Sequence, residues 1–154
     1  MAVRRAVAAD AERLAEIHLA ARLDAMPDIV IPHPPGDVVR YHRDEVIPAM
    51  ETWVAAEAGV VSGYLAMSPG WVHHLYLDPA DTGRGIGAQL LELAKERQPD
   101  GFELWVFQAN DGARRFYERH GLRAVRFTDG RGNEERAPDL LERWRPSPSP
   151  SAAP

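Results

Sequence analysis

The chain of 154 residues contains no cysteine, and this absence removes several kinds of chemistry at once. Disulfide bonds, cysteine nucleophiles and thiolate metal sites are all excluded. A chain without disulfides suits the reducing cytoplasm, which is the location that we expect. The spacing of the His, Asp and Glu residues resembles no metal-binding pattern either, so we expect no metal site.

The sequence also lacks an excess of positive charge and any long apolar run. Its 18 basic and 23 acidic residues give a net charge of −5. A broad surface for nucleic acid or for an anionic membrane needs a basic excess, so neither partner is expected. The N-terminus has no apolar stretch of the kind found in signal peptides, and no run approaches the roughly 20 residues of a spanning helix.

The length and the absence of an internal repeat indicate one domain, which we place at residues 1–145. Hydrophobic residues make up 45% of the chain and charged residues 27%, values that are typical of globular proteins. Residues 146–154 read PSPSPSAAP. We expect this low-complexity tail to be disordered.

The most informative stretch is residues 71–97. It begins with a strand-like segment at 71–77, turns at Asp78-Pro79, and continues through the glycine-rich sequence 82–87. A strand, a glycine-rich turn and the start of a helix therefore follow one another directly, an arrangement in which backbone N–H groups can bind a phosphate. The apolar positions after the turn lie on one helical face: Ile86, Leu90, Leu93 and Ala94.

The three glycines of this turn are Gly83, Gly85 and Gly87. Without side chains there, the N–H groups of residues 83–88 can approach an anion closely, and Arg84 could add a charge-assisted contact. The same glycines could instead serve only the turn. The sequence GRGIGA also matches a dinucleotide fingerprint. Rossmann domains normally open with that unit, whereas three expected meander strands precede it here, so a dinucleotide-binding domain is less favoured.

The remaining segments predict a mixed α/β fold with the order β-α-α-β-β-β-α-β-α-β-β. The strands before and after the central helix should be parallel, through a right-handed crossover. Asp10 and Asp37 are expected to cap the first two helices, and Pro138 is expected to interrupt the last strand at an edge or bulge. The expected strands are 3–7, 52–57, 60–67, 71–77, 102–107, 122–128 and 134–144, and the expected helices are 11–25, 37–47, 86–97 and 110–120.

Two motifs, taken together, resemble the GCN5-related N-acetyltransferase (GNAT) superfamily. Thr82-x-x-Gly85-x-Gly87, after HHLYLDP, resembles its motif A, Gln/Arg-x-x-Gly-x-Gly/Ala. LWVFQANDGARRFYERHGL at 104–122 resembles its following strand and motif B, and RFTDGRGNEERAPDLLERW resembles a closing hairpin of many bacterial members. The resemblance covers residues 1–145. The one departure is Thr82, which is shorter than the usual Gln or Arg.

The resemblance implies a sheet that splays between strands 71–77 and 102–107, with the pantetheine arm of acetyl-CoA in the opening. A backbone N–H of the first strand could polarise the thioester carbonyl. The acetyl group would pass directly to an amine without an acyl-enzyme. The residues implied in cofactor binding are Leu75, Tyr76, Leu77, Thr82, Gly83, Arg84, Gly85, Ile86, Gly87, Ala88, Asn110, Ala113 and Phe116.

Tyr117 matches the family's general acid. A phenol with a pKa of about 10 can protonate a departing thiolate, whose thiol has a pKa of about 8.5, if it is well placed. Its position on the inner stripe of a helix also fits a packing role. Asn110 could contact the pantetheine amides, cap its helix, or do both.

An amine acceptor with a pKa of about 10 arrives protonated, so a base would help. His73 and His74 are the catalytic candidates, because they lie on opposite faces of the strand at the thioester and one must face the acceptor. Either could instead only pack within the protein. Glu57, at the end of its strand, is a further candidate base, although a solvated carboxylate near a turn is the commoner explanation for such a residue.

The acceptor pocket should be formed by the first two helices and the loop between them, residues 24–36. The alternative is that this proline-rich segment is only an exposed connector. The residues that could line the pocket are Met26, Ile29, Ile31 and His33, with Asp24 or Asp28 available to meet a cation.

The sequence therefore predicts an acetyl-CoA-dependent N-acetyltransferase that acts on an unidentified small-molecule or peptide amine. Members of the family often dimerise, so the resemblance allows a homodimer. The alternative hypothesis is a non-catalytic acyl-CoA-binding or regulatory module. Release of thiol from acetyl-CoA in the presence of a panel of amines distinguishes the two.

Overall fold

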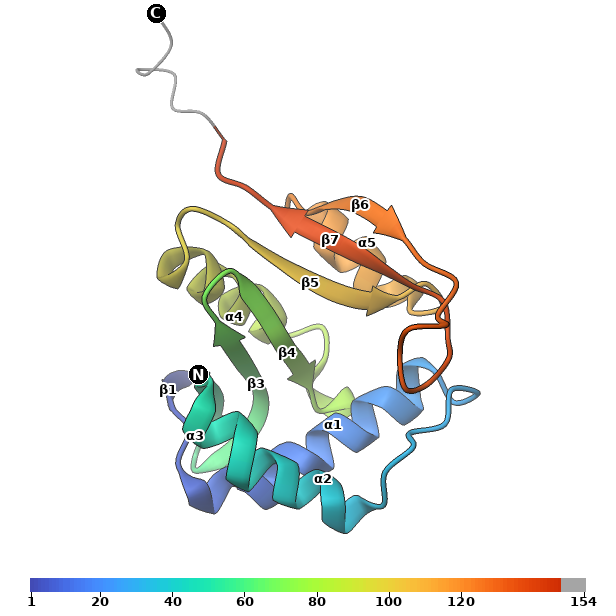
Figure 1. Cartoon of the computed structure of the whole chain (residues 1–154). Coiled ribbons are helices and arrows are strands. Elements are labelled where there is room, and N and C mark those ends of the chain that lie inside the picture. The colour runs from blue at the N-terminus through green and yellow to red at the C-terminus, as the bar shows by residue number, and fades with distance from the viewer. Residues whose placement is uncertain (148–154) are drawn as a thin grey trace, which may run out of the picture.

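In the computed structural model, residues 1–147 form a seven-stranded mixed sheet with helices on both faces (Figure 1). The strands lie in the order β1-β2-β3-β4-β5-β7-β6, and within these residues β4 and β5 are the one parallel pair of neighbours. Nearly all of the tail expected at 146–154 lies outside the described residues. None of the helices formed by residues 1–147 combines the length and apolar character needed to cross a membrane.

The observed elements follow the predicted order, so the mixed α/β fold is confirmed. The strands are β1 Ala2–Arg5, β2 Glu51–Glu57, β3 Val60–Ser68, β4 Trp71–Leu77, β5 Phe102–Phe107, β6 Arg123–Phe127 and β7 Asp139–Trp144. The helices are α1 Ala11–Ala25, α2 Pro35–Tyr41, α3 Ile47–Ala49, α4 Ile86–Arg97 and α5 Asp111–Arg119.

Each face of the sheet has its own apolar core. Helices α1 and α2 cover one face, and α4 and α5 cover the other (Figure 1). Leu14 and Ile17 of α1 pack in a cluster with Tyr64. On the opposite face Leu90 of α4 belongs to a larger cluster that includes Phe102 of β5. The apolar stripes of the two amphipathic helices thus fix the two layers against the sheet.

The second helical region differs from the prediction at both ends. It begins at Pro35, with Pro34 as the preceding cap residue, so Asp37 lies in the first turn and does not cap the helix. The chain then passes through a π-helical turn, His42–Val46, into α3. Pro48 lies in the first turn of α3, where a missing N–H costs little, and therefore the helix does not stop before it.

The first strand is shorter than predicted, and Asp10 has another role. β1 ends at Arg5, and a short turn of 3-10 helix precedes α1. Asp10 accepts a hydrogen bond from the Val7 N–H at 2.8 Å and two from the Arg4 guanidinium, at 2.9 and 3.0 Å. Its carboxylate therefore joins β1 to the start of α1 and does not cap the helix, and the Arg4 hydrogen bond lowers its pKa.

The closing hairpin also differs from the prediction. β7 begins at Asp139, so Pro138 precedes the strand and does not interrupt it. β7 lies between β5 and β6, which leaves β6 at the edge of the sheet. Residues 128–138 form a loop. The side chain of Gln108 joins its two ends, because it donates to the carbonyls of Thr128 and Asp139 at 2.9 and 3.0 Å. Long-range contacts thus replace the first part of the predicted strand.

A cluster of three histidines, of which His42 is fully buried and the other two are partly buried, lies between β4 and the helices of the α1 and α2 face. His18 comes from α1, His42 from the π-helical turn and His74 from β4, and their ring centroids are 5.6–5.8 Å apart. Burial lowers the pKa of all three, that of His18 to about 3 and that of His74 well below its usual value. Within residues 1–147 no group of three His, Cys, Asp or Glu side chains is placed to bind a metal ion. The lowered pKa values keep the three histidines neutral at pH 7.

The hydrogen bonds of this cluster fix the tautomer of His42. His42 Nδ1 lies 2.8 Å from the Val38 carbonyl, which can only accept, so Nδ1 carries the proton. The other nitrogen of a neutral His42 must then accept from the Tyr64 hydroxyl at 2.8 Å. The Tyr64 oxygen is also 3.4 Å from His18 Nδ1, which extends the chain of hydrogen bonds to α1.

A lone carboxyl group is buried on the opposite face of the sheet. Glu142 of β7 is 0% exposed, and within residues 1–147 neither of its carboxyl oxygens has a hydrogen-bond partner. Burial raises its pKa, and the nearby Glu118 raises it further. A buried carboxyl without partners favours its neutral form, so Glu142 holds a proton at a higher pH than an exposed glutamate would.

We predict that the histidine cluster makes the protein sensitive to mild acid. Folding lowers these pKa values, so below about pH 6.5 the unfolded chain binds more protons and the free energy of unfolding falls as the pH drops. The limiting slope is about 1.4 kcal/mol per pH unit for each histidine, or about 4 for three. Urea unfolding between pH 7.5 and 5 measures it. His42→Gln should reduce the slope by about 1.4 kcal/mol per pH unit, the contribution of one proton, whereas His33→Gln, outside the cluster, should leave it unchanged. Equal stability of the wild-type protein at both pH values would contradict the prediction.

Replacing Glu142 by methionine should stabilise the protein by about 1–3 kcal/mol, because it removes a buried polar group that has no partner. The raised pKa in the folded state means that proton binding stabilises the fold below the unfolded pKa of about 4.3 and that this stabilisation is lost as the pH rises. The gain from Glu142→Met should therefore be larger at pH 8 than at pH 5 in urea unfolding. The exposed Glu96→Met is the control, with an expected change within about 0.5 kcal/mol.

Candidate functional site

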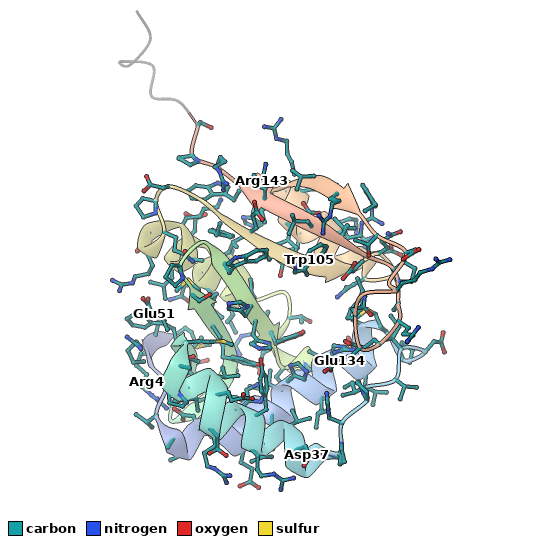
Figure 2. The ribbon with its side chains drawn as sticks, in the orientation of Figure 1. Arg4, Asp37, Glu51, Trp105, Glu134 and Arg143 are labelled. Carbon is teal, nitrogen blue, oxygen red and sulfur yellow. The ribbon has the colours of Figure 1, made fainter. Side chains whose placement is uncertain are left out.

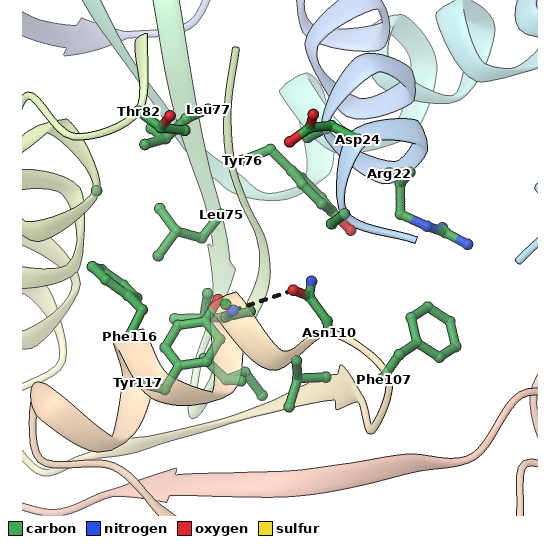
Figure 3. Close-up of a pocket in the computed structure, with 18 of the residues that line it drawn as sticks. Arg22, Asp24, Leu75, Tyr76, Leu77, Thr82, Phe107, Asn110, Phe116 and Tyr117 are labelled. Carbon is green, nitrogen blue, oxygen red and sulfur yellow. Dashed lines mark hydrogen bonds between the residues drawn. The ribbon is translucent and has the colours of Figure 1, made fainter. Parts of the chain in front are cut away.

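The sheet opens between β4 and β5. Within residues 1–147 these parallel strands share one residue pair, Trp71 with Glu103, and the Glu103 N–H donates to the Gly70 carbonyl at 2.9 Å. Beyond this point the strands separate, as the resemblance implied. A cavity of about 630 Å³ occupies the opening, with lining residues from β4, β5 and the helices on both sides (Figure 3).

The separation leaves backbone groups of β4 facing the cavity. The Asp78 N–H donates to the Ser62 carbonyl of β3 at 2.8 Å. In an antiparallel ladder alternate residues bond to the partner strand, so Tyr76 faces β3 while the N–H and C=O groups of Leu75 and Leu77 face the opening. β4 therefore presents an unused strand edge to anything that enters the cavity.

The glycine turn lies at one end of the cavity. Gly83 and Gly85 have φ values of +81° and +82°, a conformation that glycine adopts without strain. α4 begins at Ile86, and its first hydrogen bond runs from the Gln89 N–H to the Gly85 carbonyl at 3.0 Å. The N–H groups of residues 86–88 therefore have no partner within the helix, and no acidic residue lies in this first turn. This is the electrostatic setting of an anion site.

Two side chains of the turn are already engaged elsewhere. Arg84 donates to Glu57 at 2.5 Å and to Asp81 at 2.9 Å, and it does not line the cavity. This arrangement also occupies Glu57, whose pKa the Arg84 hydrogen bond lowers. Thr82 lines the cavity, and its hydroxyl donates to the Pro79 carbonyl at 3.0 Å. The contacts that remain for a ligand at this turn are those of the backbone.

Gly87 has a packing role in addition to its place in the turn. A Cβ atom at this position would lie 3.4 Å from two ring carbons of Phe116 and 3.5 Å from a methyl carbon of Leu77. The missing side chain thus lets α4 approach α5 beside the cavity. Phe116 and Leu77 both line the cavity, so glycine here also sets its width.

Helix α5 brings Asn110 and Tyr117 to the cavity (Figure 3). Asn110 caps the helix, because its Oδ1 accepts from the Ala113 N–H at 3.1 Å. Tyr117 is 8% exposed. Burial raises its pKa, as do Tyr76 and Glu142 nearby, so the phenol keeps its proton at neutral pH.

The two predicted histidines lie in different surroundings. A bulge pairs Ala66 with His74 and Met67 with Val72, which leaves His73 as the extra residue of β4. His73 is exposed and lines the cavity, with its Nε2 2.5 Å from the Ser68 hydroxyl. His74 points to the α1 and α2 face, where its Nε2 lies 3.2 Å from the Tyr41 hydroxyl.

The predicted site residues are thus largely brought together. Three of them do not line the cavity: His74 belongs to the histidine cluster, Arg84 to a surface ion pair and Ile86 to the core. The others surround it: His73, Leu75, Tyr76, Leu77, Thr82, Gly83, Gly85, Gly87, Ala88, Asn110, Ala113, Phe116 and Tyr117.

The other end of the cavity is formed by the end of α1. Asp24 and Met26 line it, as expected for the acceptor side, whereas Asp28, Ile29, Ile31 and His33 do not. His33 instead contacts Glu134 at 2.8 Å, on the loop before β7 that lies close to α1 (Figure 2).

The sequence analysis did not predict that Arg22 would contribute a positive charge at the α1 end of the cavity. Arg22 lines the cavity from the last turn of α1. It lies four and eight positions after His18 and Leu14, on the same face of the helix, and that spacing was the signal available in the sequence.

The chain matches the Acetyltransferase (GNAT) family over residues 12–122. An uncharacterized N-acetyltransferase of Archaeoglobus fulgidus is 38% identical over 86 residues, which are 53% of this chain and 58% of that protein. An uncharacterized N-acetyltransferase of Methanocaldococcus jannaschii is 36% identical over 74 residues, 46% of this chain and 33% of that protein. The aligned regions thus span less than two thirds of these relatives.

Solved structures share the fold at low sequence identity. The apo form of YjaB from Escherichia coli has a TM-score of 0.76 at 23% identity and covers 93% of this chain and 96% of its own. The PaiA N-acetyltransferase of Thermoplasma acidophilum, in complex with coenzyme A, has a TM-score of 0.72 at 18% identity, covering 94% and 98%. YncA of Salmonella typhimurium, solved with acetyl-CoA, has a TM-score of 0.71 at 20% identity, covering 99% of both chains. With the family match over most of its described residues and this shared fold, the chain belongs to the GNAT family of acetyltransferases.

Proposed function

We propose that the chain is an acetyl-CoA-dependent N-acetyltransferase that transfers the acetyl group directly to a primary amine. The observation that carries this proposal is the opening between β4 and β5, with a glycine turn at one end and an unused strand edge along its wall. The relatives named N-acetyltransferases and the structural neighbour solved with acetyl-CoA support the same donor.

Each part of the donor has a matching surface. The pyrophosphate fits the N-terminal end of α4, where the N–H groups of residues 86–88 are without helical partners. The amides of the pantetheine arm can bond to the backbone of Leu75 and Leu77, in the manner of a further strand. The Asn110 side chain stands beside that path while it caps α5. The thioester then lies near Tyr117, within the opening.

The proposed reaction needs one proton to leave and one to arrive. The amine nitrogen attacks the thioester carbonyl carbon, and a backbone N–H of β4 stabilises the oxyanion that forms. Collapse of the tetrahedral intermediate breaks the C–S bond, and Tyr117 gives its proton to the sulfur. The nitrogen loses its own proton as the amide forms. Burial makes a lasting Tyr117 phenolate costly, so its proton must be replaced promptly from the amine side.

Two histidines are candidates for the base that accepts the proton leaving the amine. His73 lines the cavity and is exposed, so a water molecule can connect it to the acceptor. His74 lies on the other face in the neutral cluster, where burial holds its pKa far below its usual value. A base must be able to take up a proton, and this requirement favours His73.

Gly85→Ala should weaken binding of coenzyme A about tenfold or more, because alanine disfavours the left-handed conformation that aims the N–H groups of the turn. Gly59→Ala is a matched control, since Gly59 has φ +79° in the β2–β3 turn and, like Gly85, has no atom within 4 Å of an added Cβ. Both variants should lose a similar stability of about 1–2 kcal/mol. Calorimetric titration measures the affinity, and equal affinities for the two variants would contradict the assignment.

Tyr117→Phe should lower the acetylation rate by about 10²–10⁴-fold with little change in the affinity for coenzyme A, because it removes a proton donor and keeps the ring. Thiol release from acetyl-CoA with a panel of amines measures the rate. Tyr64→Phe, a buried tyrosine on the other face, is the control. Binding of acetyl-CoA without thiol release for every amine would favour the non-catalytic binding module.

A further inference from the structure

Arg22 is a buried cation at the end of the cavity away from the glycine turn. Its side chain is 7% exposed. Figure 3 shows it with Phe107 on the side of the pocket opposite Thr82 and Phe116. The guanidinium carbon lies 5.0 Å from the centre of the Phe107 ring, which holds the group against the end of β5. Arg22 is therefore fixed in place beside the acceptor end of the cavity.

The guanidinium is poorly satisfied for a buried charge. Its hydrogen bond from Nη2 to Glu135 measures 3.3 Å, which is long for a charge-assisted contact, and the Tyr76 hydroxyl is a further polar neighbour. The Nε–H is buried and has no partner among residues 1–147. A guanidinium offers five donors, and a buried one is stable only when most of them are used. The arrangement leaves donors for a ligand that brings its own acceptor atoms.

We propose that the acceptor is a small amino acid in the broad sense, an amine that also carries a carboxylate, and that Arg22 binds this carboxylate. The proposal rests on the proposed acetyl transfer and adds the class of its acceptor. A planar carboxylate matches the fork of a guanidinium, whereas a polyamine would place a second cation against it. The phosphates of the donor are served by the glycine turn at the other end, so Arg22 is not needed there.

Asp24 supplies the complementary charge. It lines the same end of the cavity, two residues after Arg22 on α1, and makes no hydrogen bond or ion pair with the rest of residues 1–147. Its carboxylate can attract the ammonium group of an arriving acceptor, while Arg22 takes the carboxylate. A cation and an anion at one end of the cavity complement a zwitterion better than they complement an acceptor with charge of one sign.

The test compares acceptors that differ in one group. Acetylation is measured by thiol release for α-amino acids against their amides, and for ω-aminocarboxylates against diamines of equal chain length. We expect the carboxylates to react with a kcat/KM at least about tenfold higher, the range of a hydrogen bond to a charged group. A wild-type protein that prefers amides or diamines, or that treats acids and amides alike, overturns the proposal.

Substitutions at Arg22 and Glu135 test whether the preference for carboxylates depends on Arg22. Arg22→Gln should raise the KM for carboxylate acceptors about 10–100-fold and leave the affinity for acetyl-CoA unchanged, and Arg22→Lys should restore part of the loss. Glu135→Gln removes the internal partner and keeps the guanidinium, so it should retain or increase the preference for acids. An Arg22→Gln protein that keeps the preference overturns the proposal. If this variant does not fold, the Glu135→Gln preference and the wild-type ratio decide.

Failure of the proposed acetyl transfer gives a different experimental result from failure of the Arg22 proposal. In that case acetyl-CoA does not bind in calorimetry, or binds without thiol release for any amine. Thermal shift of the protein with each acid and its amide, in the presence of coenzyme A where it binds and in its absence where it does not, then reads out the carboxylate site alone. Acids that stabilise the protein more than their amides do support the Arg22 site, and equal shifts overturn it.

Discussion

One hydrogen bond, from the Glu103 N–H to the Gly70 carbonyl, marks the place where β4 and β5 still belong to a common sheet. Beyond it the two parallel strands separate, so the backbone N–H and C=O groups along their facing edges lose the hydrogen-bond partners that buried backbone groups need. Other contacts support the separation: β5 is held by β7 on its far side, and β4 by β3. The backbone groups left without partners are what a pantetheine arm can use, and the glycine turn follows β4 almost directly.

Alternation along β4 divides the cavity into two chemically different halves. Leu75 and Leu77 pack toward α4 and α5, beside Phe116, and make an apolar passage. His74 and Tyr76 face α1 and α2 and join a network of rings and hydrogen bonds. The same seven-residue strand therefore offers an apolar side to the proposed path of the pantetheine arm and a polar side to the proposed acceptor. The opening in the sheet is what connects them.

Local signals predicted the centre of this site, and long-range contacts decided the rest. The strand, turn and helix at 71–97, the parallel strand after it and the Asn110 cap each depend on neighbouring residues, and the structure has them. The loop before β7 depends on Gln108, twenty positions away from Thr128. The sequence analysis allowed Arg84 to contact a phosphate, but in the structure Arg84 forms an ion pair with Glu57. Arg22 carried no motif, and its partner Glu135 lies 113 positions along the chain.

The buried histidines constrain where the proton of the amine can go. With a pKa of about 3, His18 would have to take a proton from an ammonium whose pKa is about 10, at a cost of roughly 10 kcal/mol. The cluster is therefore a neutral part of the core between β4 and the helices on the α1 and α2 face, and not a store for protons. In the proposed reaction the amine therefore loses its proton to the open side of the cavity, where His73 is exposed, or to the Tyr117 and thiolate pair. The proposed binding of an acceptor carboxylate at Arg22 would leave the amine free to make that exchange before it attacks.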